Sequence, residues 1–118
     1  MKHQEKTIDF LELPLGSPDD LTRTKQFFTS VFGWVFKDWG SDFADTTDSS
    51  LGCGLNADPA HRSSMPLAVI YAANLEEMLA KVLAHGGTLV RPIFSFPGGR
   101  RFHFQDPAGN ELAVWSDQ

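Results

Sequence analysis

The chain has 118 residues, of which 42% are hydrophobic and 21% are charged, and this composition is typical of one globular domain. Ten Lys and Arg residues against fifteen Asp and Glu residues give a net charge of -5, which argues against a protein that binds nucleic-acid phosphates through a basic surface. Apolar stretches are interrupted within about ten residues, well short of the ~20 that a membrane-spanning helix needs.

The first half of the chain is predicted to hold a strand, a helix and three short strands. Alternating leucines predict a strand over residues 7–15. Ser17 is expected to cap a helix that has Pro18 at its first position, and Gly33 to end it. Short strands are then predicted at residues 34–37, 42–46 and 51–55, followed by a polar loop over residues 56–66.

The second half repeats this order. An apolar run over residues 67–72 predicts a strand, and Asn74 with Glu77 forms a capping-box pattern at the start of a helix that ends near Gly86. The remaining strands are predicted at residues 88–91, 101–105 and 111–115, with a loop over residues 92–99 and a tight turn over residues 106–109.

Both halves therefore predict the order β-α-β-β-β, in modules spanning residues 7–56 and 66–116 of a single domain, 1–118. Neither half alone carries enough apolar surface for a stable core. We therefore expect an α+β domain whose tandem modules form one curved mixed sheet, with the helices on one face and a cup on the other.

Three segments carry a resemblance to a known family. Residues 27–34 read Phe-Phe-Thr-Ser-Val-Phe-Gly-Trp, Gly86-Gly87 follows the second helix, and residues 104–112 read Phe-Gln-Asp-Pro-Ala-Gly-Asn-Glu-Leu. In this order and spacing they resemble the helix-to-strand corner, the helix end and the final hairpin of the vicinal oxygen chelate superfamily. This superfamily includes the glyoxalase, bleomycin-resistance and extradiol-dioxygenase proteins, and the resemblance covers nearly the whole chain.

The resemblance also provides a test for a metal. Most catalytic members hold a divalent metal with four His, Glu or Gln ligands, one each from the first, fourth, fifth and eighth strands. In this sequence three of these positions fall on Phe10, Leu67 and Ala113, and the predicted fourth strand contains no His, Glu or Gln. Such side chains donate nothing to a metal, so the resemblance implies a member without the usual metal and without another cofactor.

Alternation along the strands predicts which side chains face the cup. Phe102 and Phe104 are expected under the helices, which leaves Arg101 and His103 on the cup side. Glu12 and His103 are the candidate catalytic pair, because a carboxylate in a partly apolar strand needs a partner and histidine exchanges protons near neutral pH. The residues expected to bind a planar or aromatic ligand are Phe10, Leu67, Val69, Tyr71, Arg101, Glu111, Ala113 and Trp115.

Three functions remain open. The leading hypothesis is a metal-free member of the superfamily that binds a small organic molecule in the cup, as a sequestering protein or as an enzyme. The first alternative is a metal-dependent lyase, isomerase or dioxygenase similar to glyoxalase I, with Glu12, His103 and Glu111 as ligands. The second is a self-associating or regulatory module without a substrate.

Partners and location follow from the resemblance and the composition. Many superfamily members form dimers, so we expect a homodimer, and the number of aromatic residues, among them Trp34, Trp39 and Trp115, is consistent with an apolar contact surface. The segment Gly98-Gly99-Arg100-Arg101 is expected to be a mobile flap over the cup, with Arg100 or Arg101 meeting an anionic substrate. Because Met1 to Glu5 is polar with no following apolar run, we expect an unprocessed protein. The lone Cys53 cannot form an internal disulfide, which is compatible with the cytoplasm.

Overall fold

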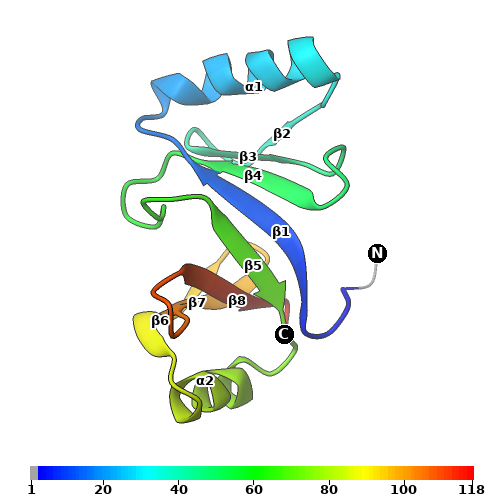
Figure 1. Ribbon diagram of the computed structural model, residues 1–118. Helices are drawn as coiled ribbons and strands as arrows, with labels where there is room; N and C mark the ends of the chain where they lie inside the picture. Colours follow the sequence, from blue (N-terminus) through cyan, green and yellow to red (C-terminus); the bar gives the residue numbers. More distant parts are fainter. Residues whose placement is uncertain (1–2) are drawn as a thin grey trace. The chain divides into compact units, whose positions relative to one another are not determined.

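The computed structural model describes residues 3–118, and Figure 1 shows its elements in chain order. Each half carries a strand, a helix and three further strands, as predicted. The elements are β1 (Thr7–Pro14), α1 (Asp19–Phe32), β2 (Lys37–Asp38), β3 (Phe43–Thr46), β4 (Gly52–Asn56), β5 (Leu67–Tyr71), α2 (Leu75–Ala84), β6 (Thr88–Phe96), β7 (Gly99–Gln105) and β8 (Glu111–Ser116).

The strands form a mixed sheet. Their hydrogen-bonded order is β2-β3-β4-β1-β5-β8-β7-β6. The pairs β1–β4 and β5–β8 are parallel, whereas both hairpins of each half are antiparallel. This arrangement confirms the predicted α+β class. The chain packs as two compact units, a first unit of residues 10–67 and a second unit of residues 3–9 with 68–118.

In the first unit, α1 packs on one face of its four strands. The core is formed by Leu21 of the helix with Ala44 and Leu55 of β3 and β4. Leu13 of β1 and Leu15 just after it point toward this helix, as their alternate positions in the chain allow. The partly buried side chains packed against the core are Leu13, Leu15, Phe28 and Phe36.

On the opposite face of the first unit, two aromatic rings lie over a glycine of β4. Gly54 pairs with Glu12 of β1, and a Cβ atom at Gly54 would lie 2.6 Å from the Phe10 ring and 2.8 Å from the Phe43 ring. No side chain fits there without moving the rings. The absence of a side chain at Gly54 therefore allows Phe10 and Phe43 to lie over β4.

In the second unit, α2 packs on one face of the strands β5-β8-β7-β6. Its core joins Leu75 of the helix to Ala72, Phe102 and Val114, which confirms that Phe102 lies under the helix. The predicted cap is also present, because the Asn74 side chain accepts a hydrogen bond from the Glu77 backbone N–H at 3.1 Å. Side chains partly buried against this core are Met78, Leu79, Val82, Leu89, Ile93 and Phe104.

The start of α1 differs from the expectation. Pro18, with φ -58° and ψ -26°, is the N-cap residue, and no side chain caps the helix, so the expected Ser17 cap is wrong. Asp19 and Asp20 instead place negative charge in the first turn, where the helix dipole favours it. Within residues 3–118, no helix is long and apolar enough to cross a membrane.

Two strand predictions also need correction. Of the strand expected at residues 34–37, only Lys37 lies in a strand, the two-residue β2. The backbone before it is bound elsewhere, because the Trp34 carbonyl accepts from Thr29 Oγ1 at 2.6 Å and the Val35 N–H donates to Asp48 at 2.8 Å. The loop expected at residues 92–99 is largely strand β6, and Gly99, Arg100 and Arg101 of the expected flap belong to strand β7. Pro92 is tolerated because β6 is an edge strand with register shifts on either side of Arg91.

Candidate functional site

A carboxylate–histidine pair lies on the face of β7 and β8 that points away from α2. His103 Nδ1 is 2.8 Å from Glu111 Oε2, and the His103 side chain is fully buried whereas 23% of the Glu111 side chain is exposed. The two residues are diagonal neighbours, because His103 pairs with Ala113 and Gln105 pairs with Glu111. The tight turn over residues 106–109, in which Asp106 accepts from the Ala108 and Asn110 backbone N–H groups, sets this register.

The second ring nitrogen of His103 has no hydrogen-bond partner among residues 3–118. Nε2 is buried and makes no hydrogen bond within the described residues. Because the Glu111 carboxylate accepts hydrogen bonds, Nδ1 carries the proton and Nε2 presents a bare lone pair in the neutral ring. Leaving such a buried atom unpaired costs about 1–3 kcal/mol, so the position is prepared for a hydrogen-bond donor.

The environment keeps this imidazole neutral. Burial lowers the pKa of His103, and the positive charge of Arg101 lowers it further, whereas the hydrogen bond to Glu111 acts in the opposite direction without restoring the ordinary value. Charge repulsion and desolvation therefore outweigh the carboxylate. A neutral imidazole held by a carboxylate is suited to accept a proton at Nε2.

Arg101 lies two residues from His103 on β7 and shares an aromatic neighbour with it. The guanidinium carbon of Arg101 is 5.4 Å from the Phe94 ring centre, and the His103 ring centre is 5.8 Å from the same ring. Arg101 is 8% exposed and belongs to the strand, which corrects the expectation that it lies in a flap. Arg100 instead forms an ion pair with Glu76 of α2 at 2.7 Å, on the other face of the sheet.

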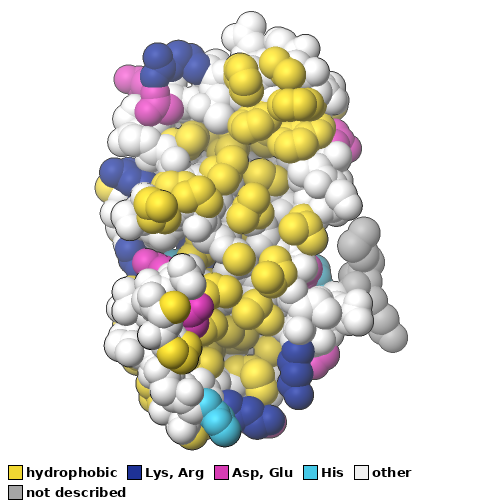
Figure 2. All heavy atoms as spheres, in the orientation of Figure 1, with side chains coloured by type: hydrophobic (Ala, Val, Ile, Leu, Met, Phe, Trp, Pro, Cys, Tyr) yellow, Lys and Arg dark blue, Asp and Glu magenta, His cyan; other side chains and the backbone are white. Residues whose placement is uncertain are grey.

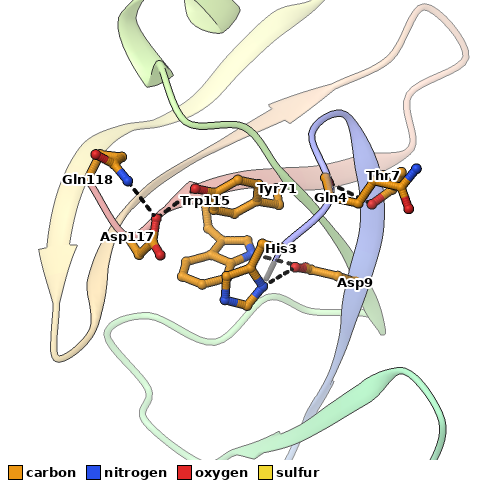
Figure 3. A network of polar contacts seen from close by, with 8 residues as sticks. All are labelled: His3, Gln4, Thr7, Asp9, Tyr71, Trp115, Asp117 and Gln118. Atoms are coloured by element: carbon orange, nitrogen blue, oxygen red, sulfur yellow. Dashed lines mark hydrogen bonds and ion pairs between the residues drawn. The ribbon is translucent and has the colours of Figure 1, made fainter. Parts of the chain in front are cut away.

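The strand register brings further predicted ligand residues to the same face. Val69 pairs with Ala113, which pairs with His103, and Tyr71 pairs with Trp115, which pairs with Arg101. Tyr71 and Trp115 are in edge-to-face contact with ring centres 5.2 Å apart. Trp115 Nε1 donates to Asp9 at 2.9 Å, and the Tyr71 hydroxyl donates to Asp117 at 2.7 Å (Figure 3).

The other predicted site residues belong to the first unit. Glu12 is 2% exposed, and its Oε2 accepts a hydrogen bond from Asn56 Nδ2 at 3.1 Å. Phe10 covers Gly54, as described above, and Leu67 is fully buried. The expected pairing of Glu12 with His103 stays a prediction.

Comparison with known proteins identifies the family. The profile of the Glyoxalase/Bleomycin resistance protein/Dioxygenase superfamily matches residues 17–114, which is most of the chain. The chain belongs to this superfamily. A search of curated proteins finds no match.

Solved structures of superfamily proteins and others share the fold. A Legionella pneumophila protein described as NAD-dependent benzaldehyde dehydrogenase is 13% identical, with a TM-score of 0.74 over 91% of this chain and 96% of that one. Methylmalonyl-CoA epimerase from Mycobacterium tuberculosis is 12% identical, with a TM-score of 0.68 over 98% and 92%. A superfamily member from Vibrio splendidus 12B01 is 18% identical, with a TM-score of 0.65 over 91% and 96%. At these identities the likeness shows the fold alone.

The resemblance implies that three of the usual metal positions of the glyoxalase superfamily fall on Phe10, Leu67 and Ala113, and the absence of a metal stays a prediction. These side chains contain no nitrogen, oxygen or sulfur. The matching strand β4 offers glycine, cysteine, leucine and asparagine, and burial raises the pKa of the Cys53 thiol, which keeps it protonated. Among residues 3–118, no group of three or more His, Cys, Asp or Glu side chains is placed to hold a metal ion.

Four residues that contact the predicted site residues, namely Phe94, Asn56, His3 and Asp9, are absent from the sequence-based predictions. Phe94 was assigned to a loop, and Asn56 to the start of a loop, so neither was expected beside Arg101 or Glu12. His3 and Asp9 precede or begin the first strand, in a stretch without a recognisable motif. The alternation of the first strand could have drawn attention to Asp9, because it lies two residues before Leu11 and is polar.

Proposed function

We propose that this superfamily member binds a small organic molecule on the face of β5-β8-β7-β6 that points away from α2, without the metal of its catalytic relatives. The observation that carries the proposal is the buried His103 Nε2, which lacks a hydrogen-bond partner within the described residues while Glu111 holds Nδ1. A ligand hydroxyl or N–H group is the partner that completes this histidine.

The surrounding side chains support a planar ligand with an acidic hydrogen. Tyr71 and Trp115 offer aromatic surface on the same face, and Arg101 supplies positive charge beside the imidazole. If the ligand proton passes to Nε2, the resulting anion lies near a guanidinium group, which lowers its energy. His103 then acts as a general base, and Glu111 keeps its ring in the required tautomer.

Thermal unfolding in the presence of a library of phenols, hydroxylated aromatics and aromatic acids tests the proposal. A ligand at a hundred times its Kd stabilises the protein by about 2.7 kcal/mol. We expect at least one compound to raise the Tm of the wild type, and His103→Gln to weaken its binding by roughly tenfold or more. His85→Gln, at an exposed histidine after α2, is the matched control and should bind as the wild type does.

Two results would overturn this function. One is a library that leaves the wild-type Tm unchanged, which favours the self-associating or regulatory module. The other is a ligand that stabilises His103→Gln as strongly as the wild type, which places binding elsewhere.

The absence of a resident metal is tested separately. We expect protein purified without a polyhistidine tag to contain no stoichiometric metal, and Mn²⁺, Ni²⁺ or Zn²⁺ to leave its Tm unchanged. Stoichiometric tight binding would instead favour the metal-dependent lyase, isomerase or dioxygenase, for which Glu12, His103 and Glu111 are the candidate ligands.

We also propose a cytoplasmic homodimer. Superfamily membership supports self-association, and so do the exposed apolar side chains of α1 and the segment after it, which gather over the helix in Figure 2. The lone cysteine, which has no possible internal partner, supports a reducing compartment.

A further inference from the structure

The ring of His3 packs against two aromatic side chains at one end of the second unit. Its ring stacks on Tyr71, with centres 4.9 Å apart and planes 25° apart, and meets the edge of Trp115 at 4.6 Å and 82°. Its Nδ1 is 2.9 Å from Asp9 Oδ2. Figure 3 shows the imidazole between these three side chains, which we call the His3 subsite (Asp9, Tyr71 and Trp115).

The walls of this subsite are held by contacts that do not involve His3. Asp9 uses its other oxygen, Oδ1, to accept from Trp115 Nε1 at 2.9 Å. Tyr71 is fixed at its hydroxyl by Asp117 and at its backbone carbonyl by the Lys6 N–H at 2.8 Å. Tyr71 and Trp115 are also register partners on paired strands. The subsite therefore keeps its shape when the imidazole leaves.

His3 itself is attached by its side chain. Within the described residues, the chain is tied down from Gln4 onward, where the carbonyl accepts from Thr7 Oγ1 at 2.8 Å and Glu5 accepts from the Ala73 N–H at 2.7 Å. The hydrogen bond of His3 comes from its ring, and 33% of its side chain is exposed. Because the first strand begins at Thr7, displacement of the His3 ring breaks no strand pairing among the described residues.

Carboxylates lie around the subsite. Asp9 contacts the imidazole, and Asp117 accepts from Tyr71. The hydrogen bond to Asp117, burial, the charge of Asp117 and the charge of Glu5 raise the pKa of Tyr71, whereas a hydrogen bond with Gln118 acts in the opposite direction. Aromatic faces beside carboxylates attract cations and ring N–H donors and repel anions.

We propose that the His3 subsite binds a planar nitrogen heterocycle that carries a ring N–H, and that His3 is its internal stand-in. A ligand ring stacks on Tyr71, meets the edge of Trp115 and donates its N–H to Asp9 Oδ2, in place of the imidazole. The inference rests on the proposed function in one respect, because the subsite lies on the same face as His103, and it names the class of ligand group bound at that end.

The probe is imidazole, added to wild-type protein and to His3→Ala. The readout is the indole N–H signal of Trp115 in a proton–nitrogen correlation spectrum, assigned by comparison with Trp34→Phe and Trp39→Phe. We expect His3→Ala to bind imidazole with a roughly millimolar Kd. The wild type should bind at least about tenfold more weakly, because the tethered His3 competes at a high effective concentration.

Three controls make the result specific. Thiazole, a planar heterocycle without a ring N–H, should bind His3→Ala about tenfold more weakly than imidazole, since it loses the charge-assisted hydrogen bond. Asp9→Asn in the His3→Ala background should weaken imidazole by a similar factor while still accepting from Trp115. His61→Ala, which removes an exposed histidine outside the subsite, should leave the wild-type response unchanged.

The inference is overturned if imidazole does not shift the Trp115 signal in His3→Ala, if wild type and variant bind it equally, or if Asp9→Asn has no effect. His3→Gln provides a second opened variant should His3→Ala prove poorly folded. Because none of these measurements involves His103, their failure is distinguishable from failure of the proposed function, which is decided by His103→Gln.

Discussion

The imidazole of His103 and the carboxylate of Glu111 lie 2.8 Å apart on neighbouring strands, the histidine fully buried and the carboxylate partly exposed. The carboxylate can therefore stay hydrated on one side while it fixes the tautomer of a ring that solvent does not reach. This unequal burial explains why the pKa of His103 is lowered in spite of an adjacent negative charge.

Stability should decrease with falling pH because of His103. Its pKa in the folded protein lies below the ordinary value of 6.5, so between these two pH values the unfolded chain binds more protons than the folded one. The stabilisation is complete above about pH 6.5 and is lost as the pH falls through the folded-state pKa. Thermal unfolding between about pH 5 and 8 should show this loss in wild type and His85→Gln, and a weaker one in His103→Gln. An unchanged slope in His103→Gln would contradict the assignment.

Removal of the Glu111 carboxylate should destabilise the fold. In Glu111→Ala both ring nitrogens of His103 lack a partner in a buried position, which costs about 1–3 kcal/mol. Glu77→Ala is the matched control, because it removes an exposed carboxylate 3.5 Å from Lys81 and should cost less than about 0.5 kcal/mol. Urea unfolding followed by circular dichroism measures both. Equal effects of the two substitutions would show that Glu111 does not support His103.

A methyl group at Gly54 should also be destabilising. Gly54→Ala places a Cβ atom against the rings of Phe10 and Phe43, and we expect a loss of about 1–3 kcal/mol in the free energy of unfolding. Phe10→Leu in the same chain should recover part of the loss, since it removes the nearest ring. A double variant whose loss equals the sum of the single losses would rule out this contact as the cause.

The exposed apolar side chains of α1 should control oligomeric state. Phe27 and Val31 are both 56% exposed on this helix, near Phe32 at 59% and Val35 at 71%. Light scattering at micromolar concentration should give about twice the chain mass for wild type, and Phe27→Lys with Val31→Lys should shift it to a monomer. Met65→Lys, at a residue 68% exposed outside this cluster, is the control. A monomeric wild type would remove the dimer proposal.

Local sequence patterns predicted the elements that depend on interactions between residues a few positions apart. Leucine alternation predicted β1, and the Asn74 side chain predicted the start of α2, because both depend on residues a few positions apart. Pro92 misled the prediction of β6, since proline usually ends a strand but is accommodated on an edge beside a register shift. Whether a strand lies on an edge is a property of the sheet, which the local sequence does not report.

The candidate site was predictable in part for a similar reason. Alternation places Arg101 and His103 on one face, and the turn after Gln105 is enough to align β7 with β8. The pairing of His103 with Glu111 follows from that alignment, whereas the pairing of His103 with Glu12 stays a prediction. The position of His3 was beyond such reasoning, because its contacts with Tyr71 and Trp115 span most of the chain.

The stacking of His3 on Tyr71 has a practical consequence for how this protein is prepared. A polyhistidine tag fused before Met1 would carry many imidazoles within reach of the same aromatic surface, and imidazole used for elution would add more. In ligand screens on such material, these imidazoles would compete with the compounds in addition to His3. A carboxy-terminal tag also requires care, because Asp117 and Gln118 contact Tyr71 or one another, so a tag removed by a protease is preferable.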